Sequence, residues 1–219
     1  MQFNFSSYNN VFFDCDGVLL NSNHIKTQAF KNVSIRFGQD VAEKFIAYHV
    51  SNGGVSRYEK FEYLITNILG IDTNDLKTTD LLSDFSNQVE KGLMAAEVAE
   101  GLHNLRKDSD ANWFVVSGGD QEELRKVFKL RGIDIYFNGG VWGSPATKYQ
   151  IIENLITKSM VREKSLFIGD SKLDFEVSRY FNFDFVFLRK WSEVKTPDKY
   201  FLGKDVLILD TLKDITKML

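Results

Sequence analysis

The sequence predicts an α/β protein in which helices cover both faces of a mostly parallel sheet, with a helical domain inserted near the start of the chain. Two observations predict this architecture. From about residue 113 to residue 209, short apolar runs alternate with helical patterns, which is typical of a parallel sheet. From residue 22 to about residue 91, apolar residues recur at helical spacing almost throughout, which predicts several helices and no strand.

The first strand is predicted at Val11–Phe13, a short apolar run that leads into Asp14-Cys15-Asp16-Gly17. An apolar strand that ends in acids and glycine is common where open α/β sheets bind ligands. We place the insertion directly after it. A core domain is then expected at residues 1–20 and 93–219, and a helical cap at residues 21–92, over the carboxyl ends of the strands.

Four helices are predicted within the cap. Ser22 can cap the first helix and Gly38 can end it, while Thr79 can cap the fourth. The flexible loop at residues 51–54 separates the second helix from the third. The apolar positions that define the helices are Ile25, Ala29, Val33 and Phe37; Val41, Phe45 and Tyr48; Tyr58, Phe61, Ile65 and Ile68; and Leu82, Phe85, Val89 and Leu93.

The rest of the chain supplies the remaining elements of the sheet and its covering helices. Strands are predicted at residues 113–116, near 135–137, at 166–168, 185–188 and 206–209, and helices at 121–130, 149–157 and shortly before 185.

Composition excludes several classes of protein. The 219 residues are 43% hydrophobic, enough for one substantial core, and 27 basic against 30 acidic residues leave no basic excess for binding nucleic acid. One cysteine cannot form an intrachain disulfide or a cysteine-based zinc site, which favours a cytoplasmic protein. No leader pattern or long apolar run is present, so we expect no membrane partner. We expect a monomer or small homo-oligomer, a choice that the sequence leaves open.

Polar residues follow three of the predicted strands. Asp14 and Asp16 follow the first, Ser117 with Gly118 follows the second, and Asp170 follows the strand at 166–168. Parallel strands bring these groups to one edge of the sheet. Lys148, between the third strand and its following helix, can join the same crevice.

Crowded carboxylates repel one another and raise each other's pKa unless a cation lies among them. Because the sequence offers carboxylate and backbone oxygens but no cluster of His or Cys, Mg²⁺ is the expected cation. Asp174, four residues after Asp170, is either a further ligand, directly or through water, or a residue of the helix surface.

Such a site suits phosphoryl transfer, because a metal and an ammonium neutralise the charge of a phosphate before an anionic nucleophile approaches. Asp14 would attack phosphorus to form an aspartyl phosphate. Asp16 would protonate the leaving alcohol and then deprotonate water. Ser117 and the amides near Gly118 would bind phosphoryl oxygens, and Lys148 would pair with Asp14 and the phosphate.

Four segments, DCDGVLLNS, VVSGG, Lys148 and GDSKLD, resemble in order and spacing the four motifs of the haloacid dehalogenase superfamily, over nearly the whole chain. The resemblance is closest to helical-cap members such as phosphoglycolate phosphatase and β-phosphoglucomutase. It implies a Rossmann-like core in three layers, Asp14 as nucleophile and Asp16 as general acid/base. It also implies Mg²⁺ bound by Asp14, by the Asp16 carbonyl and by Asp170.

The resemblance extends to the cap. The segment at residues 54–57, Gly-Val-Ser-Arg, looks like the specificity loop of β-phosphoglucomutase, so Gly54 and Arg57 are expected to bind the part of the substrate that is not transferred. Arg57 is otherwise an exposed residue of a first helical turn. Lys26 stands about where the mutase has a histidine that works with the acid/base aspartate, which weakens the case for mutase activity.

We therefore expect a Mg²⁺-dependent phosphomonoesterase acting on a small phosphorylated metabolite, such as a phosphoglycolate-like compound or a sugar phosphate. A sugar-phosphate mutase of the β-phosphoglucomutase type is the alternative enzyme. A phospho-accepting signalling module is the alternative of another class, disfavoured because the acceptor aspartate of such modules lies nearer mid-chain and no cap intervenes. The three histidines, His24, His49 and His103, are scattered and suggest no site.

Overall fold

The computed structural model describes residues 3–72, 78–161 and 163–218, and its centre is a parallel sheet. The strands are β1 (Asn10–Phe13), β2 (Asn112–Asp120), β3 (Gly140–Ser144), β4 (Ser165–Gly169), β5 (Asp184–Leu188) and β6 (Leu207–Leu209). Within the described part they form one six-stranded sheet in the order β3-β2-β1-β4-β5-β6, and every pairing is parallel. The predicted α/β class is confirmed.

Two apolar layers hold the helices against this sheet. Because side chains of a strand alternate in direction, Val11 and Phe13 of β1 face one layer and Phe12 faces the other. The first layer contains α5 (Leu102–Lys107), α6 (Gln121–Leu130) and α10 (Leu212–Thr216). The second contains α7 (Lys148–Thr157), α8 (Lys172–Tyr180) and α9 (Pro197–Phe201). In the second layer the Phe12 ring stacks on Phe114 and Phe183, with centroids 4.9 and 5.0 Å away.

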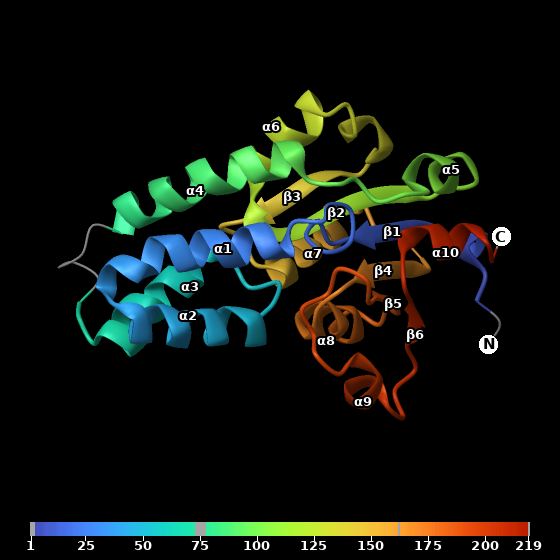
Figure 1. The fold of residues 1–219 in the computed structure, drawn as a ribbon. Coiled ribbons are helices and arrows are strands. Elements are labelled where there is room, and N and C mark those ends of the chain that lie inside the picture. Colours follow the sequence, from blue (N-terminus) through green and yellow to red (C-terminus); the bar gives the residue numbers. More distant parts are fainter. Residues whose placement is uncertain (1–2, 73–77, 162, 219) are drawn as a thin grey trace.

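The cap helices, which we define as α1 to α4, lie together to one side of the sheet (Figure 1). They are α1 (Asn23–Ser34), α2 (Gln39–Ser51), α3 (Arg57–Tyr63) and α4 (Thr78–Ala95), with a 3₁₀ turn at Ile35–Phe37 and a π-helical segment at Leu64–Leu69. Phe30 forms their centre and contacts the rings of Phe45, Phe61 and Phe85. The run of helices agrees with the sequence pattern, while α4 continues past the predicted boundary at residue 92.

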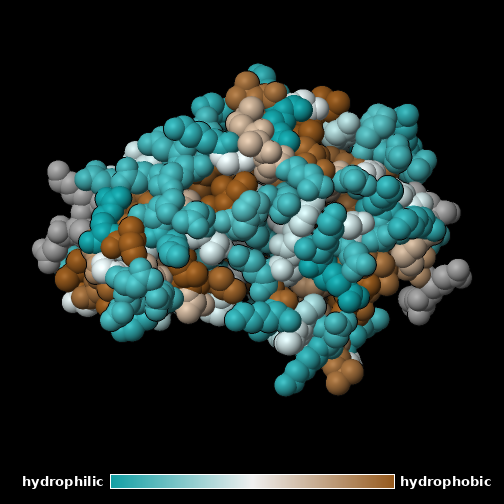
Figure 2. Space-filling view, in the orientation of Figure 1, coloured by the Kyte–Doolittle hydropathy of each residue, from teal (hydrophilic) through white to brown (hydrophobic). Residues whose placement is uncertain are grey.

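The surface in the view of Figure 2 is mainly hydrophilic, with apolar residues in smaller groups between the polar ones. No helix of the described ranges combines the length and the apolarity needed to cross a membrane.

Three sequence-based expectations about local structure were wrong. Residues 134–136 form a 3₁₀ turn, and the third strand lies at Gly140–Ser144 instead of near 135–137. Thr79 lies inside α4, which begins at Thr78, and does not precede it. Ser22 occupies the N-cap position, directly before α1, but its side chain makes no capping hydrogen bond there, because its hydroxyl donates to Asp16.

Candidate active site

The loop after β1 carries Asp14 and Asp16 at the carboxyl edge of the sheet. Its backbone turns tightly, with the Leu19 and Leu20 amides both donating to the Cys15 carbonyl. Gly17 has φ +76°, and a Cβ there would lie 2.2 Å from Oδ2 of Asp170. Only glycine therefore permits this turn and lets the two acidic loops approach each other.

Lys148 joins two of the acids. Lys148 is the first residue of α7, directly after Thr147, which caps the helix. The prediction that Lys148 lies in the stretch before this helix was therefore wrong. Its Nζ lies 3.0 Å from Oδ2 of Asp14 and donates to Oδ1 of Asp174 at 2.5 Å. Burial alone would lower the pKa of Lys148, but Asp14 and Asp174 raise it above its ordinary value. Lys148 therefore carries its positive charge between the two carboxylates.

Asp174 is fully buried, so it is not a residue of the helix surface. Its Oδ2 accepts hydrogen bonds from the Ser171 hydroxyl at 2.7 Å and from the Ser171 and Asp170 amides at 3.1 and 3.3 Å. Since Lys148 occupies its other oxygen, Asp174 holds the loop after β4 in shape and positions the ammonium.

Asp14, Asp170 and Asp174 form a buried cluster in which one carboxylate oxygen of each lies within 4.8 Å of the others. Burial raises the pKa of Asp14 to about 7, against the opposing effect of Lys148. Burial and the neighbouring Asp14 raise the pKa of Asp170 well above its ordinary value. One lysine is thus too little positive charge for this cluster, which could bind a metal ion.

The donor set fits Mg²⁺. It consists of hard carboxylate oxygens, and the cluster contains no His or Cys that would favour a softer metal. Asp14 and Asp170 are better placed as ligands than Asp174, whose oxygens are already bound by Lys148 and Ser171.

Asp16 has different surroundings from the cluster. Ser22 donates a hydrogen bond to its Oδ1 at 2.6 Å, and Lys26 of α1 forms an ion pair with its Oδ2. Burial would raise the pKa of Asp16, but the Lys26 charge and these hydrogen bonds outweigh it and lower the pKa below its ordinary value. Asp16 is therefore ionised at neutral pH, whereas the pKa of Asp14 is raised to about 7. The pKa values of two carboxylates two residues apart are thus shifted in opposite directions, which is a pattern found where two acids have different roles.

Ser117 and Gly118 lie within β2, whose pairing with β3 shifts register between Val116 and Asp120. Ser117 is buried, and its Oγ accepts a hydrogen bond from the Gly119 amide at 3.0 Å. A Cβ on Gly118 would lie 2.2 Å from the carbonyl oxygen of Gly54 in the cap loop. The absence of a side chain at Gly118 thus allows the cap loop to approach this strand.

A cavity of about 1170 Å³ lies between the cap helices and the carboxyl edge of the sheet. Asp14, Asp16 and Asp170 line it from the core, together with Gly118. Gly54 and Arg57 line it from the cap. The structure therefore brings the predicted acids and the predicted cap loop to one cavity.

Arg57 has partners that the sequence did not suggest. Its guanidinium binds Glu123 of α6 through two hydrogen bonds of 2.6 and 3.0 Å, and it donates to Ser86 at 2.7 Å. It also lies 4.7 Å from the centroid of the Phe85 ring. It is buried and not the exposed residue considered as the alternative. Its predicted contact with substrate stays a prediction, because this arrangement uses its charge to connect cap and core.

Two buried residues of the cavity wall, His49 and Lys60, were missed by the sequence analysis. A signal was present. Lys60 follows the buried Arg57 by three residues and directly precedes the buried Phe61 in α3, and His49 follows the buried Phe45 by four in α2. Charged or titratable residues at the apolar phase of a helix mark positions where burial serves something other than packing.

Comparisons with known proteins place this geometry in context. A sequence model described as Haloacid dehalogenase-like hydrolase matches residues 11–188. A search of curated proteins gave no match.

Solved structures show the same fold. A hydrolase from Pseudomonas syringae is 16% identical with a TM-score of 0.74, covering 95% of this chain and 96% of that one. A predicted phosphatase from Clostridium acetobutylicum is 16% identical with a TM-score of 0.73, covering 96% and 97%. YfnB of Bacillus subtilis, whose structure holds magnesium, is 15% identical with a TM-score of 0.66, covering 97% and 98%. At these identities the likeness concerns the fold alone.

Proposed function

The chain belongs to the haloacid dehalogenase-like hydrolases, and on that premise we propose that it is a Mg²⁺-dependent phosphomonoesterase acting through an aspartyl phosphate on a phosphorylated metabolite. The observation that carries the proposal is the contrast between two neighbouring acids. The Asp14 carboxylate is held by Lys148 in the buried acidic cluster, and Asp16 stands outside it, ionised and paired with Lys26.

Asp14 is suited to attack phosphorus. The Cys15 amide donates to its Oδ1 at 2.7 Å and Lys148 contacts its Oδ2, so the carboxylate is fixed before substrate arrives. Mg²⁺, held by Asp14, the Asp16 carbonyl and Asp170, would supply positive charge for the phosphoryl oxygens. Lys148, the Ser117 hydroxyl and the amides near Gly118 would bind those oxygens as charge develops on them.

Asp16 is suited to proton transfer. In its ionised form it would take a proton from the water that hydrolyses the aspartyl phosphate. Protonation of the leaving alcohol in the first step would use the proton that Asp16 takes from water in the second step of each turnover, while Lys26 stays hydrogen-bonded to the same carboxylate. Release of the alcohol and hydrolysis would thus use the same carboxylate in opposite directions.

The proposed partner is a small phosphorylated metabolite, in a cytoplasmic setting. The alternative of a sugar-phosphate mutase uses the same nucleophile, and measuring free phosphate against isomer formed separates the two.

The decisive experiment removes the nucleophile. The wild-type protein with Mg²⁺ should release phosphate from p-nitrophenyl phosphate, and Asp14→Asn should lower that rate at least about a thousandfold. EDTA should abolish activity, and Mg²⁺ should restore it. Turnover by Asp14→Asn at the wild-type rate would exclude the mechanism. Asp134→Asn, far along the chain in the 3₁₀ turn before β3, is a matched control that should leave the rate unchanged.

A further inference from the structure

Lys60 places a buried ammonium in the wall of the cavity that holds the catalytic acids. Only 3% of the residue is exposed, and it lines the same cavity as Asp14 and Asp16. Its Nζ lies 5.5 Å from the centroid of the Phe30 ring. Within the described ranges no carboxylate lies within 4.0 Å of this nitrogen, whereas Lys26 and Arg57 each pair with one and Lys148 pairs with two.

A chain of hydrogen bonds fixes this ammonium in place. Lys60 Nζ donates to Nδ1 of His49 at 2.8 Å, His49 Nε2 lies 2.9 Å from the Thr27 hydroxyl, and Thr27 donates to Glu193 at 2.6 Å. Burial, with the charges of Lys60 and Lys26, lowers the pKa of His49 to about 2, so its ring is neutral and its Nδ1 accepts. These hydrogen bonds connect the core residue Glu193 to the cap and orient Lys60. The Glu193 charge raises the pKa of Lys60 but does not outweigh burial and Lys26.

Packing alone does not explain a lysine at this position. An ammonium has three donors, and His49 is the single hydrogen-bond partner found in the described part of the chain. Burial, together with Lys26, lowers the pKa of Lys60 to about 7, which reflects the free-energy cost of charging the amine here. A methionine of similar length would fill the space without that cost. What the site lacks is an anion, and the cavity is where an anion can enter.

We propose that Lys60 is a specificity-determining residue that binds a second anionic group of the substrate, remote from the phosphate that is transferred. The substrate class is then a phosphomonoester of about sugar size that also carries a carboxylate or a second phosphate. This inference deepens the proposed function and rests on it. The cavity of about 1170 Å³ has room for a compound of this size. Glu123 already binds the Arg57 guanidinium through two hydrogen bonds, whereas no carboxylate of the described residues contacts the Lys60 ammonium.

The test compares three probes that share a phosphorylated sugar skeleton of similar size: glucose 6-phosphate, 6-phosphogluconate and fructose 1,6-bisphosphate. Binding is measured by calorimetry with Mg²⁺ in the Asp14→Asn protein, which does not turn over. At least one of the two probes with a second anion should bind about tenfold more tightly than glucose 6-phosphate, as expected for one charge-assisted contact. Which of the two binds distinguishes a carboxylate from a phosphate.

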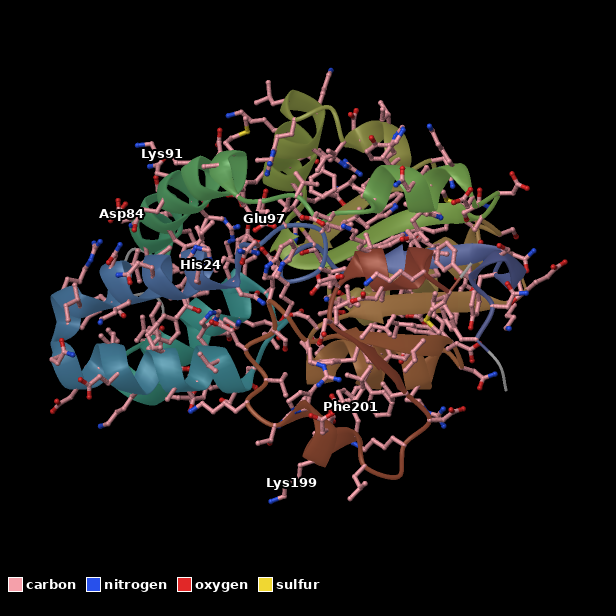
Figure 3. The ribbon with its side chains drawn as sticks, turned by 45° about the vertical axis from the view of Figure 1, so that its right-hand side comes forward. His24, Asp84, Lys91, Glu97, Lys199 and Phe201 are labelled. Carbon is pink, nitrogen blue, oxygen red and sulfur yellow. The ribbon has the colours of Figure 1, made fainter. Side chains whose placement is uncertain are left out.

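Adding Lys60→Met should remove this advantage and leave the affinity for glucose 6-phosphate within about twofold. Lys91→Met is the matched control, since Figure 3 shows Lys91 on the outer side of α4, away from the cavity, and it should change no affinity. Lys60→Gln repeats the test with a polar side chain if the methionine variant does not fold. The inference would be overturned if all three probes bound with equal affinity, or if none bound detectably. It would also be overturned if Lys60→Met weakened the binding of all three probes equally.

The wild-type protein separates this inference from the proposed function. Phosphate released from all three probes with equal kcat/KM would retain the phosphatase and reject the anion contact. A preference for the second anion that depends on Lys60, without phosphate release from any probe, would retain the contact and reject the phosphatase.

Discussion

Two buried lysines, Lys148 in the core and Lys60 in the cap, are equally inaccessible to solvent and have opposite surroundings. Each is 3% exposed. Lys148 lies between Asp14 and Asp174, which raise its pKa, whereas Lys60 has a neutral histidine as partner and a pKa lowered to about 7. The core thus supplies the counter-charges of its own catalytic ammonium. The cap leaves one ammonium for a ligand, which separates the chemistry of the reaction from the choice of substrate.

Removing the core lysine is expected to have the largest effect. Lys148→Met leaves Asp14 and Asp174 buried without their cation, so the free energy of unfolding should fall by about 3 kcal/mol. Phosphate release should fall at least about a hundredfold, because the orientation of Asp14 is lost. Urea denaturation and the p-nitrophenyl phosphate assay measure the two effects. If the variant were as stable as the wild type, the Lys148 ammonium would not be compensating the buried charges of Asp14 and Asp174.

Breaking the ion pair between Arg57 and Glu123 should have the second largest effect. It tests whether this pair stabilises the contact between the cap and the core. Arg57→Met leaves Glu123 buried and unpaired, and should lower the free energy of unfolding by about 2 kcal/mol. The double variant Arg57→Met with Glu123→Leu should recover most of this loss, as urea denaturation would show. A large rise in KM with unchanged stability would contradict the pairing and favour the substrate contact expected from sequence.

These ion pairs also show where the sequence is informative. The loops at Asp14 and Asp170 were predictable because a few adjacent residues determine them: an apolar strand, an acid and a glycine or serine that allows the turn. Arg57 and Glu123 are 66 positions apart, and no local pattern connects them. The role of Asp174 could not be predicted for the same reason, since it depends on contact with Lys148, which is 26 positions away.

The misplaced third strand has a local cause. Residues 135–137, Ile-Tyr-Phe, have high strand propensity, but Ile135 and Tyr136 belong to the 3₁₀ turn at Asp134–Tyr136. Phe137, which follows the turn, is buried against Phe13 and Trp113. The true strand, Gly140–Ser144, contains two glycines and carries little propensity of its own. Its pairing with β2 determines it, which is a tertiary contact that a single sequence does not display.

Removing the cap lysine should have the opposite sign from removing the core lysine. Lys60→Met exchanges an uncompensated buried ammonium for an apolar side chain of similar length, so the free energy of unfolding at pH 7 should rise by about 1–2 kcal/mol. Chemical denaturation of the wild type and the variant measures this. A clear loss of stability would show that Lys60 serves the fold, and the comparison with Lys148 would no longer hold.

The pH dependence of unfolding gives the finest test of the same contrast. The pKa of Lys60 falls from an ordinary 10.5 to about 7 on folding, so the unfolded chain binds the proton more tightly. Its destabilising contribution is therefore complete below about pH 7 and disappears as the pH rises toward 10.5. Between pH 7 and pH 9 the wild type should gain about 1 kcal/mol relative to Lys60→Met, allowing for relaxation of the buried site. The difference between the two proteins cancels titration of Lys148 and the tyrosines, which both share. A stability difference that stays constant from pH 7 to pH 9 would mean that the Lys60 amine keeps an ordinary pKa, with a counter-charge already beside it and no need of one from a substrate.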